Sequence, residues 1–521
     1  MDVLVEKIVS DTSDQFSKDI VSFQENYQDK TTFEELNKKQ LREKLWETLF
    51  HYLSDNTQSS VHYNCLSTLR ILSRDKTNIN ELVTDERINV ILENAALKDA
   101  NVEQNINTNV TIEALKLLCN LIFNSTRVQQ VIPTSCLSCV IEHMKKYNNA
   151  IPREIILFDT RIIFLITALN ISMRQIVKTD LNGDECLINI LENIIQNEGE
   201  EYTLKGDTTA LLCEVLKALF NLYISSSDST EEEEEKTKRL VLILHKLLLS
   251  KCEKTDDLHS NIANLLTVIP HGYYSTIIPP TKENHRYVYQ ERDMRAVYIL
   301  LKFLYKRLNY KDDLIGNLSP IVTAFVRMVK AERLIRKYTR LQILPPLIDV
   351  MHRPEEGTTM RAKLCQLLTS PLTELRDLVA EFLFILCKEN VTRMVKYTGY
   401  GNAAGMFANK GLLGTNKKKS AYSSESEDSE TEEYLKHKEQ INPVTGCFEH
   451  PKPNPLEGMT EEQKEYEALQ LVGLVDKLTR EGLVQPCRIG EDGKPKPIGH
   501  VLELQEELPK QQYGHQDSDS D

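Results

Sequence analysis

A helical phrase that occurs twice limits the folds open to this 521-residue chain more than any other feature. The segments Glu113–Leu121 and Glu214–Leu222 lie 101 residues apart and share Leu, Lys, Leu and Asn at the same steps. Three other stretches have a similar apolar rhythm, and the anchor residues of all five are spaced by 49, 47, 54 and 46 residues: Leu66, Leu115, Ile162, Leu216 and Ile262. Helical units that recur about every 40–50 residues are typical of armadillo and HEAT repeats, which stack because no unit buries its apolar face alone. The pattern predicts an all-α fold, an armadillo/HEAT-type helical-repeat superhelix with a long inner groove.

The composition agrees with stacked helices. Apolar residues make up 41% of the chain and aromatic residues 7%, with 19 glycines, which suits Leu- and Ile-rich helices better than a β fold. We expect the superhelix to span residues 1–415, with residues 1–60 as an end cap and Trp46 in its first core layer. A run of serines followed by Glu231–Glu235 has the composition of a solvated loop.

Nearly all of the net negative charge lies in the tail. The whole chain carries −14, and residues 421–521 alone hold ten Lys and Arg against 23 Asp and Glu, a net charge of −13. The near-neutral body argues against nucleic acid as the main ligand, because neutralising phosphates needs a large basic excess. We expect a largely extended acidic C-terminal tail that carries one short helix.

The eleven cysteines are scattered, as expected for reduced thiols packed among apolar residues of a cytosolic protein. Cys136 and Cys139 form the only C-x-x-C, with no second pair and no histidine pair at zinc spacing, so we expect no metal site and no cofactor. No basic segment followed by an apolar run opens the chain, and no 18 apolar residues run together. We therefore expect neither a signal peptide nor an integral membrane segment.

Arg70 and Arg74 are four residues apart and share one helix face, while leucines line another. Two interpretations stay open: a solvated rim of charges, or two guanidinium groups that point into the groove and bind carboxylates or peptide carbonyls.

Asn120 and Asn221 occupy the same step of the repeated phrase, although Asn is a poor helix former. Such an Asn either hydrogen-bonds a peptide that lies in the groove or ties one repeat to the next. Asn124 and Arg127 continue the first of these helices and have the same two interpretations.

A second group of cations follows between residues 327 and 340. Its members recur at steps of 3, 3, 4 and 3, which at helical pitch form one basic stripe: Arg327, Lys330, Arg333, Lys337 and Arg340. The stripe suits an acidic peptide or a terminal carboxylate, and a charged outer face explains it equally well.

Three glycines lie close together at Gly399, Gly401 and Gly405. A nucleotide-binding loop is rejected, because a helix precedes them where the dinucleotide fingerprint needs a strand, and no G-K-[ST] follows. We expect these glycines to close the stack of helices.

Several segments together resemble synembryn, the resistance-to-inhibitors-of-cholinesterase family. They are Arg70–Asp75, Leu344–Pro346, Tyr397–Gly405, Ile441–Gly446 and Asn454–Gln463, and the resemblance covers most of residues 60–480. It implies a protein that binds heterotrimeric G-protein α subunits (Gα), chaperones their folding and acts as a receptor-independent guanine nucleotide exchange factor. It also implies that the concave face takes the C-terminal helix of Gα.

The residues fit that implication. A groove with cations and amides on one side and the basic stripe on the other would accept an amphipathic helix that ends in a carboxylate. The expected groove residues are Arg70, Arg74, Asn120, Asn124, Arg161, Asn221, Arg333 and Arg340. Exchange of this kind needs no bond chemistry, because the protein stabilises the nucleotide-free state of its partner.

Residues 416–440 form an acidic linker. Ser424 has Glu427 and Ser429 has Glu432 at the +3 position, the setting that a casein kinase 2-like kinase prefers. The family resemblance implies phosphorylation at these two serines with raised exchange activity. The alternative is an unmodified, disordered spacer.

Residues 441–482 are expected to contact the partner. Thr460 and Gln463 form a capping-box pattern, and the helix that follows carries a narrow apolar seam: Leu471, Leu474, Val475 and Leu478. The seam either packs back on the superhelix or contacts Gα. Residues 483–521 are mostly polar and predict a disordered end.

The main alternative function is a passive armadillo-type scaffold or adaptor that binds peptides without promoting nucleotide release. A hydrolase or transferase is not supported, because no set of nucleophile, base and acid stands out. We expect a cytoplasmic protein that Gα recruits to the plasma-membrane cortex.

Overall fold

The computed structural model describes residues 1–10, 15–55, 59–98, 108–132, 134–147, 151–198, 203–224, 230–413, 430–450, 454–499 and 503. The chain forms two compact units, Met1–Phe303 and Leu304–Asp521, and the boundary falls within helix α17 (Arg295–Arg307). This division falls inside the predicted superhelix, and the predicted end of the superhelix at residue 415 stays a prediction.

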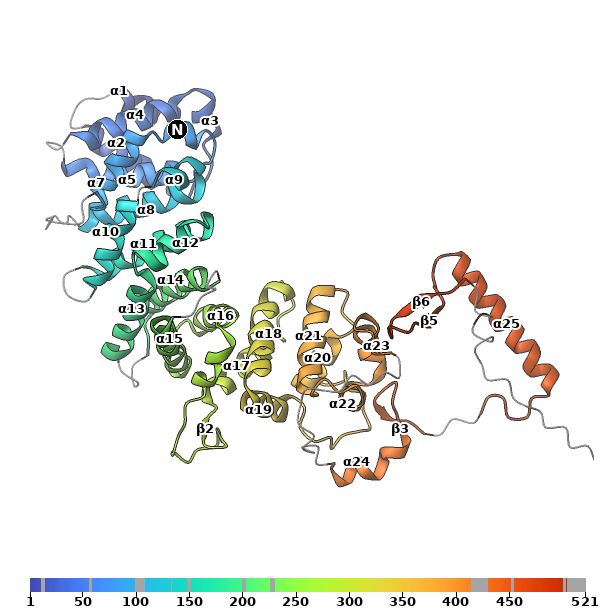
Figure 1. Cartoon of the computed structure of the whole chain (residues 1–521). Coiled ribbons are helices and arrows are strands. Elements are labelled where there is room, and N and C mark those ends of the chain that lie inside the picture. The colour runs from blue at the N-terminus through green and yellow to red at the C-terminus, as the bar shows by residue number, and fades with distance from the viewer. Residues whose placement is uncertain are drawn as a thin grey trace, which may run out of the picture. The chain divides into compact units, whose positions relative to one another are not determined.

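The first unit is built from two layers of helices (Figure 1). In one layer each helix packs on the next: α5 (Ser59–Leu72), α8 (Thr108–Asn124), α11 (Arg153–Leu169), α14 (Gly206–Tyr223) and α16 (Thr255–Leu266). The second layer consists of α4 (Leu41–Ser54), α7 (Asp85–Asn94), α10 (Thr134–Lys145), α13 (Gly183–Glu198) and α15 (Glu231–Leu249). All five predicted anchor residues are fully buried, one in each helix of the first layer. The repeat prediction is confirmed.

Further elements complete the first unit. They are α1 (Asp2–Ser10), α2 (Gln15–Tyr27), α3 (Glu34–Lys38), α6 (Ile79–Leu82), α9 (Thr126–Val131), α12 (Met173–Gln175), the π-helix η2 (Ile176–Asp180), the 3₁₀ helix η3 (His271–Ile277) and the antiparallel pair β1 (Val288–Tyr289) and β2 (Arg292–Asp293). Trp46 is fully buried in α4 and its ring lies 5.8 Å from that of Phe50, as predicted for the first core layer.

The glutamate run is not a loop. Glu231–Glu235 forms the first turns of α15, and the Thr230 hydroxyl caps the helix by accepting a hydrogen bond from Glu233 N at 3.2 Å. Carboxylates are stabilising at the positive end of the helix dipole. Glu233 also pairs with Lys178 at 3.0 Å. Composition alone suggested a solvated loop because it ignores the position of the charges relative to the helix end.

The second unit begins with the end of α17 and continues with α18 (Leu314–Ala331), α19 (Arg333–Ile343), α20 (Met360–Leu367), α21 (Thr373–Leu386), α22 (Val391–Thr398) and α23 (Tyr400–Asn409). By length and composition α18 is apolar enough to cross a membrane. It packs against α21 and α19, and the rings of Phe325 and Phe382 lie 5.8 Å apart, as in the core helix of a folded domain.

The predicted basic stripe is wrong as a single helix face. The helix stops between Lys330 and Arg333, because Glu332 has extended backbone (φ −117°, ψ 118°) and caps the next helix by accepting from Leu334 N at 3.0 Å. The five cations therefore belong to two helices, α18 and α19. The spacing of the cations does not reveal the break between α18 and α19. The two helices are separated by Glu332 alone, so the 3–4 residue spacing continues across the break.

Two segments that carried the family resemblance pack on each other in the second unit. Gly399 has a positive φ of 74° and separates α22 from α23. The first amides of α23 are satisfied by carbonyls of the other segment, with Tyr400 N donating to Pro443 O at 2.8 Å and Gly401 N to Val444 O at 2.9 Å. Gly399 and Gly401 thus lie against the segment 441–446, whereas a Cβ at Gly405 would meet no atom within 4 Å.

The tail elements are α24 (Glu432–His437), the 3₁₀ helix η4 (Lys438–Gln440), the antiparallel pair β3 (Ile441–Asn442) and β4 (Cys447–Phe448), α25 (Glu461–Arg480), and the antiparallel pair β5 (Cys487–Ile489) and β6 (Pro495–Pro497). Residues 441–448 pack on their own unit, since Phe448 N also donates to Val350 O at 2.7 Å. Leu413 N donates to Gly493 O at 3.2 Å, so part of 483–499 is ordered as well. Tail composition did not predict these contacts.

All eleven cysteines are free thiols, and all but Cys252 and Cys487 are buried. Burial raises the pKa of Cys65 to about 12 and raises the pKa of Cys136 as well. Cys136 and Cys139 lie in α10 among apolar side chains. For the buried thiols, the prediction of small apolar core residues is confirmed.

Candidate partner-binding site

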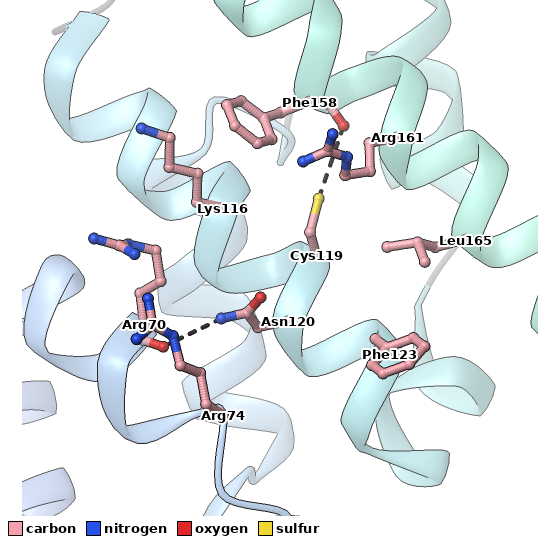
Figure 2. A pocket seen from close by; sticks show the side chains of 9 residues that line it. All are labelled: Arg70, Arg74, Lys116, Cys119, Asn120, Phe123, Phe158, Arg161 and Leu165. Atoms are coloured by element: carbon pink, nitrogen blue, oxygen red, sulfur yellow. Dashed lines mark hydrogen bonds between the residues drawn. The ribbon is translucent and has the colours of Figure 1, made fainter. Parts of the chain in front are cut away.

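A pocket of about 360 Å³ lies on the first unit along the helices α5, α8 and α11 (Figure 2). It is lined by Arg70, Arg74, Lys116, Cys119, Asn120, Phe123, Phe158, Arg161 and Leu165. Four of these residues are groove residues predicted from the sequence: Arg70, Arg74, Asn120 and Arg161. The structure brings these four together.

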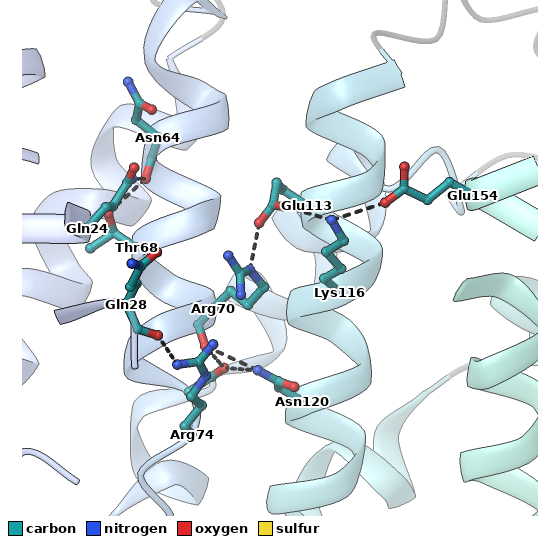
Figure 3. A network of polar contacts seen from close by, with 11 residues as sticks. Gln24, Gln28, Asn64, Thr68, Arg70, Arg74, Glu113, Lys116, Asn120 and Glu154 are labelled. Carbon is teal, nitrogen blue, oxygen red and sulfur yellow. Dashed lines mark hydrogen bonds and ion pairs between the residues drawn. The ribbon is translucent and has the colours of Figure 1, made fainter. Parts of the chain in front are cut away.

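Arg70 is oriented by a buried carboxylate on the neighbouring helix (Figure 3). Its Nε donates to Glu113 Oε2 at 2.7 Å, and Glu113 is only 4% exposed. Lys116 Nζ lies 3.1 Å from the other oxygen of Glu113 and 3.3 Å from Glu154. Because a buried carboxylate needs a cation beside it, this network fixes the guanidinium group. Within the described part of the chain Nη1 and Nη2 of Arg70 donate no hydrogen bond, and they are available to an anion.

Arg74 comes from the turn that follows α5. Its Nη1 donates to Gln28 O, and Lys30 O lies 3.4 Å away, both in the connection between α2 and α3. Burial and, second, the positive charge of Arg70 lower the pKa of Arg74 from its ordinary value. Two cations held close together favour an anion between them.

The other side of the pocket combines charge with aromatic surface. Arg161 Nη2 donates to Glu214 Oε1 of α14 at 2.9 Å, and its guanidinium lies 5.3 Å from the centroid of the Phe158 ring. Lys116 Nζ lies 5.4 Å from the same centroid. Phe123 is exposed beside them, so the pocket offers cations next to large apolar groups.

The asparagines tie consecutive helices together. Asn120 Nδ2 donates to Arg70 O at 3.2 Å, and Asn221 Nδ2 donates to Phe164 O at 3.1 Å. Asn124 Nδ2 donates to Ser73 O at 2.9 Å. The second of the two interpretations from the sequence, in which Asn joins one repeat to the next, therefore describes these amides. A contact with a partner stays a prediction, and Asn221 is only 5% exposed.

The two copies of the phrase repeat a polar arrangement as well as an apolar one. Glu113 and Glu214, 101 residues apart, are both buried. Each pairs with a lysine three residues later and with an arginine of the preceding helix in the same layer, α5 for Glu113 and α11 for Glu214. Sequence reasoning missed these glutamates, and also missed Lys116, Phe123, Phe158 and Leu165 as pocket residues. The signal was present for the glutamates, because both copies of the phrase begin with Glu.

Comparison with known proteins decides the family. The family model described as guanine nucleotide exchange factor synembryn matches residues 65–494. The chain belongs to the synembryn family. A protein of Xenopus tropicalis called Chaperone Ric-8A is 37% identical over 540 residues, 99% of this chain and 99% of that protein. Chaperone Ric-8 of Drosophila melanogaster is 34% identical over 542 residues, 93% of this chain and 94% of that protein.

A solved structure shows the same type of fold. A chain from a study of a phosphorylation switch in the interaction between cadherin and beta-catenin aligns with a TM-score of 0.51 at 13% identity, covering 80% of this chain and 72% of its own. This likeness agrees with an armadillo-type arrangement of helices in the synembryn-family chain.

The other predicted residues of the synembryn-family chain lie outside this pocket. Arg333 is exposed and Arg340 is 7% exposed, both in the second unit. The Arg340 guanidinium lies 5.9 Å from the centroid of the Tyr397 ring, and its Nη2 is 3.5 Å from the Tyr397 hydroxyl. Arg340 therefore packs against Tyr397 and is mostly buried, and its contact with a partner stays a prediction. Residue spacing predicts only the direction in which the Arg340 side chain leaves its helix. It does not show that Tyr397 of α22 lies against that side chain.

The C-terminal helix α25 keeps its apolar seam uncovered by the described residues. Its capping box is present as predicted, since Gln463 N donates to Thr460 Oγ1 at 3.2 Å and Thr460 N to Gln463 Oε1 at 3.0 Å. Leu471 is 63% and Leu474 58% exposed; Val475 is half-buried and Leu478 exposed. Ser424 and Ser429 lie outside the described residues.

Proposed function

We propose that this synembryn-family chain is a receptor-independent guanine nucleotide exchange factor and folding chaperone for heterotrimeric G-protein α subunits. The observation that supports the proposal most is the pocket of the first unit. It holds four cations over two buried carboxylates and beside exposed apolar surface: Arg70, Arg74, Lys116 and Arg161. The end of an amphipathic helix, with a free carboxylate and apolar side chains, matches this chemistry. The C-terminal helix of Gα, lying along α5, α8 and α11, is the ligand that we propose.

Exchange follows from binding alone. A protein that holds the C-terminal helix of Gα away from the rest of the subunit binds the open, nucleotide-free state more tightly than the closed one. This differential affinity shifts the population towards the open state, from which GDP dissociates. GTP favours the closed state and therefore weakens the complex, because the coupling is reciprocal. The same preference for an open subunit supports a chaperone role for nascent Gα.

A second contact is proposed for α25. Exposed leucines at helical spacing form an apolar surface on an otherwise polar helix, and such a surface is suited to a partner. We assign the seam to Gα, in addition to the pocket.

The decisive experiment measures the rate of GDP release from purified Gα, with and without this protein. We expect faster release from intact Gα and no acceleration for Gα that lacks its C-terminal helix. A passive scaffold would bind Gα and leave the GDP off-rate unchanged. Equal acceleration of intact and truncated Gα would contradict the role of the pocket.

Phosphorylation of Ser424 and Ser429 by a casein kinase 2-like kinase is also part of the proposal. Glu430, the residue after Ser429, lies 3.6 Å from Lys396 and 3.1 Å from Lys438, so the acidic segment ends beside basic residues. Added phosphates would strengthen such contacts. Equal exchange rates for the phosphorylated protein and for a Ser424→Ala, Ser429→Ala variant would contradict this. A cytoplasmic location, with recruitment to the cortex through Gα, is proposed as a consequence of the proposed binding to Gα.

A further inference from the structure

We infer that Arg42, a buried residue of α4 that does not line the pocket, is a positioning residue for the anion-binding pocket. This inference rests on the proposed function, because it assigns to Arg42 an effect on the recognition of a terminal carboxylate. Its basis is the turn that follows α5. Arg42 donates hydrogen bonds to backbone carbonyls of this turn, and Arg74 of the same turn lines the pocket.

Arg42 is 2% exposed and holds this turn through three backbone carbonyls. Its Nη2 donates to Leu72 O at 3.0 Å and to Asp75 O at 2.6 Å, and its Nη1 donates to Thr77 O at 2.6 Å. Leu72 is the last residue of α5, so the guanidinium also lies at the negative end of that helix dipole. A planar fork of donors is needed to reach three carbonyls at once.

Asp75 holds the same turn from within. Its Oδ1 accepts from Thr77 N at 2.9 Å, and its Oδ2 accepts from Phe33 N and from Asn37 Nδ2, each at 2.9 Å. Arg42 Nη1 lies 3.9 Å from Asp75 Oδ2 and 3.3 Å from Asn37 Oδ1. The buried Arg42 and Asp75 and the half-buried Asn37 thus form one network that joins α3, α4 and the turn.

The turn held in this way carries one wall of the pocket. Ser73 Oγ accepts from Asn120 Nδ2 at 3.1 Å, and Ser73 O accepts from Asn124 Nδ2 at 2.9 Å. The next residue is Arg74, whose side chain lines the pocket. A change in the turn would therefore move Arg74 relative to Arg70 without altering either side chain. Anion binding by two guanidinium groups depends on their mutual geometry.

The test compares Arg42→Lys with the unaltered protein. Lysine keeps the charge but lacks the fork, so we expect the turn to lose part of its support. The ligand is a synthetic peptide of the Gα C-terminal helix, prepared with a free carboxylate and with a C-terminal amide. The readout is the ratio of the two dissociation constants. We expect Arg42→Lys to reduce the preference for the carboxylate by about tenfold, the size of one charge-assisted hydrogen bond.

Arg239→Lys is the matched control. Arg239 joins α15 to α13 through bonds to Glu185, Glu192 and Asn189, and it does not line the pocket. We expect it to lower the melting temperature, as Arg42→Lys does, and to leave the ratio unchanged. Asn37→Ala, which removes one contact to Arg42 and one to Asp75, is the milder second variant and should reduce the ratio in the same direction.

An unchanged ratio in folded Arg42→Lys and Asn37→Ala proteins would overturn the inference while leaving the proposed function intact. A different result concerns the proposed function itself. If the unaltered protein binds the acid and the amide equally, then the pocket does not recognise a terminal carboxylate, and the inference fails together with that proposal.

Discussion

Gly399 and Gly446 lie against each other where the segment 441–446 meets the turn between α22 and α23. A Cβ atom at Gly446 would lie 3.0 Å from Gly399 Cα and 2.8 Å from Pro354 Cγ. Both glycines have positive φ, 74° and 72°. The two backbones approach this closely only because neither residue has a side chain.

Gly446→Ala is therefore expected to destabilise the second unit by about 1–3 kcal/mol, through backbone strain and the close contacts. Gly405→Ala is the control, because Gly405 lies within α23 and a Cβ there would meet no atom within 4 Å. It should be neutral or slightly stabilising. Chemical denaturation measures both. Equal stability of the two variants would mean that the tail segment does not pack on the glycine turn.

Arg70→Met should lower the free energy of unfolding by about 2 kcal/mol, since it removes a charged hydrogen bond from the buried Glu113. Arg70→Met combined with Glu113→Met should recover part of this loss. The second substitution removes the buried carboxylate that Arg70→Met alone leaves without its arginine partner. Denaturation of the two single variants and the double variant gives the coupling energy. A coupling near zero would show that Glu113 does not orient Arg70.

Leu474→Asp on α25 should leave thermal unfolding unchanged and slow Gα-dependent GDP release, because the side chain is exposed in the free protein. Leu469→Asp makes the same substitution at an exposed leucine on the opposite face of α25, outside the seam, and serves as the control. We expect nearly normal exchange for this control. Equal exchange rates for both variants would remove the seam from the proposed interface.

The network around Asp75 predicts a dependence of stability on pH. Burial alone would raise the pKa of Asp75, but hydrogen bonds from Thr77 and Phe33 and the charge of Arg42 outweigh it and hold the pKa below the usual 3.8. A carboxyl with a lowered pKa in the folded state contributes stability above its unfolded pKa and loses it as the pH falls through the folded pKa.

We therefore expect the difference in unfolding free energy between the unaltered protein and Asp75→Asn to be constant above about pH 5. The difference should shrink as the pH falls below 3.8. Denaturation at a series of pH values measures it. A difference that stays constant down to the acid unfolding of the protein would mean that the Asp75 carboxylate contributes no pH-dependent stability.

Much of the site could be predicted from residues that repeat. The apolar anchors and the repeated asparagines were visible because each reflects periodicity within one helix. The predicted shared helix face of Arg70 and Arg74 is wrong, because α5 ends at Leu72 and Arg74 lies in the turn that follows; both side chains nevertheless line the pocket. The partners of these residues were not visible. Glu113 meets Arg70 across 43 positions, and Arg42 meets the turn after α5 across 30 to 35 positions. No local spacing encodes such pairs.

The sequence by itself determined the helical repeat, its approximate period, the acidic tail and the capping box of α25, because these depend on side chains a few positions apart along one helix or on composition. Only the tertiary structure decided that the cations near residue 333 belong to two helices, that Arg340 is buried against Tyr397, and that residues 441–448 pack on the glycine turn. Those outcomes depend on which surfaces meet when segments distant in the sequence pack together. The close approach of Gly399 and Gly446, for example, arises only when the segment 441–446 packs on the turn between α22 and α23.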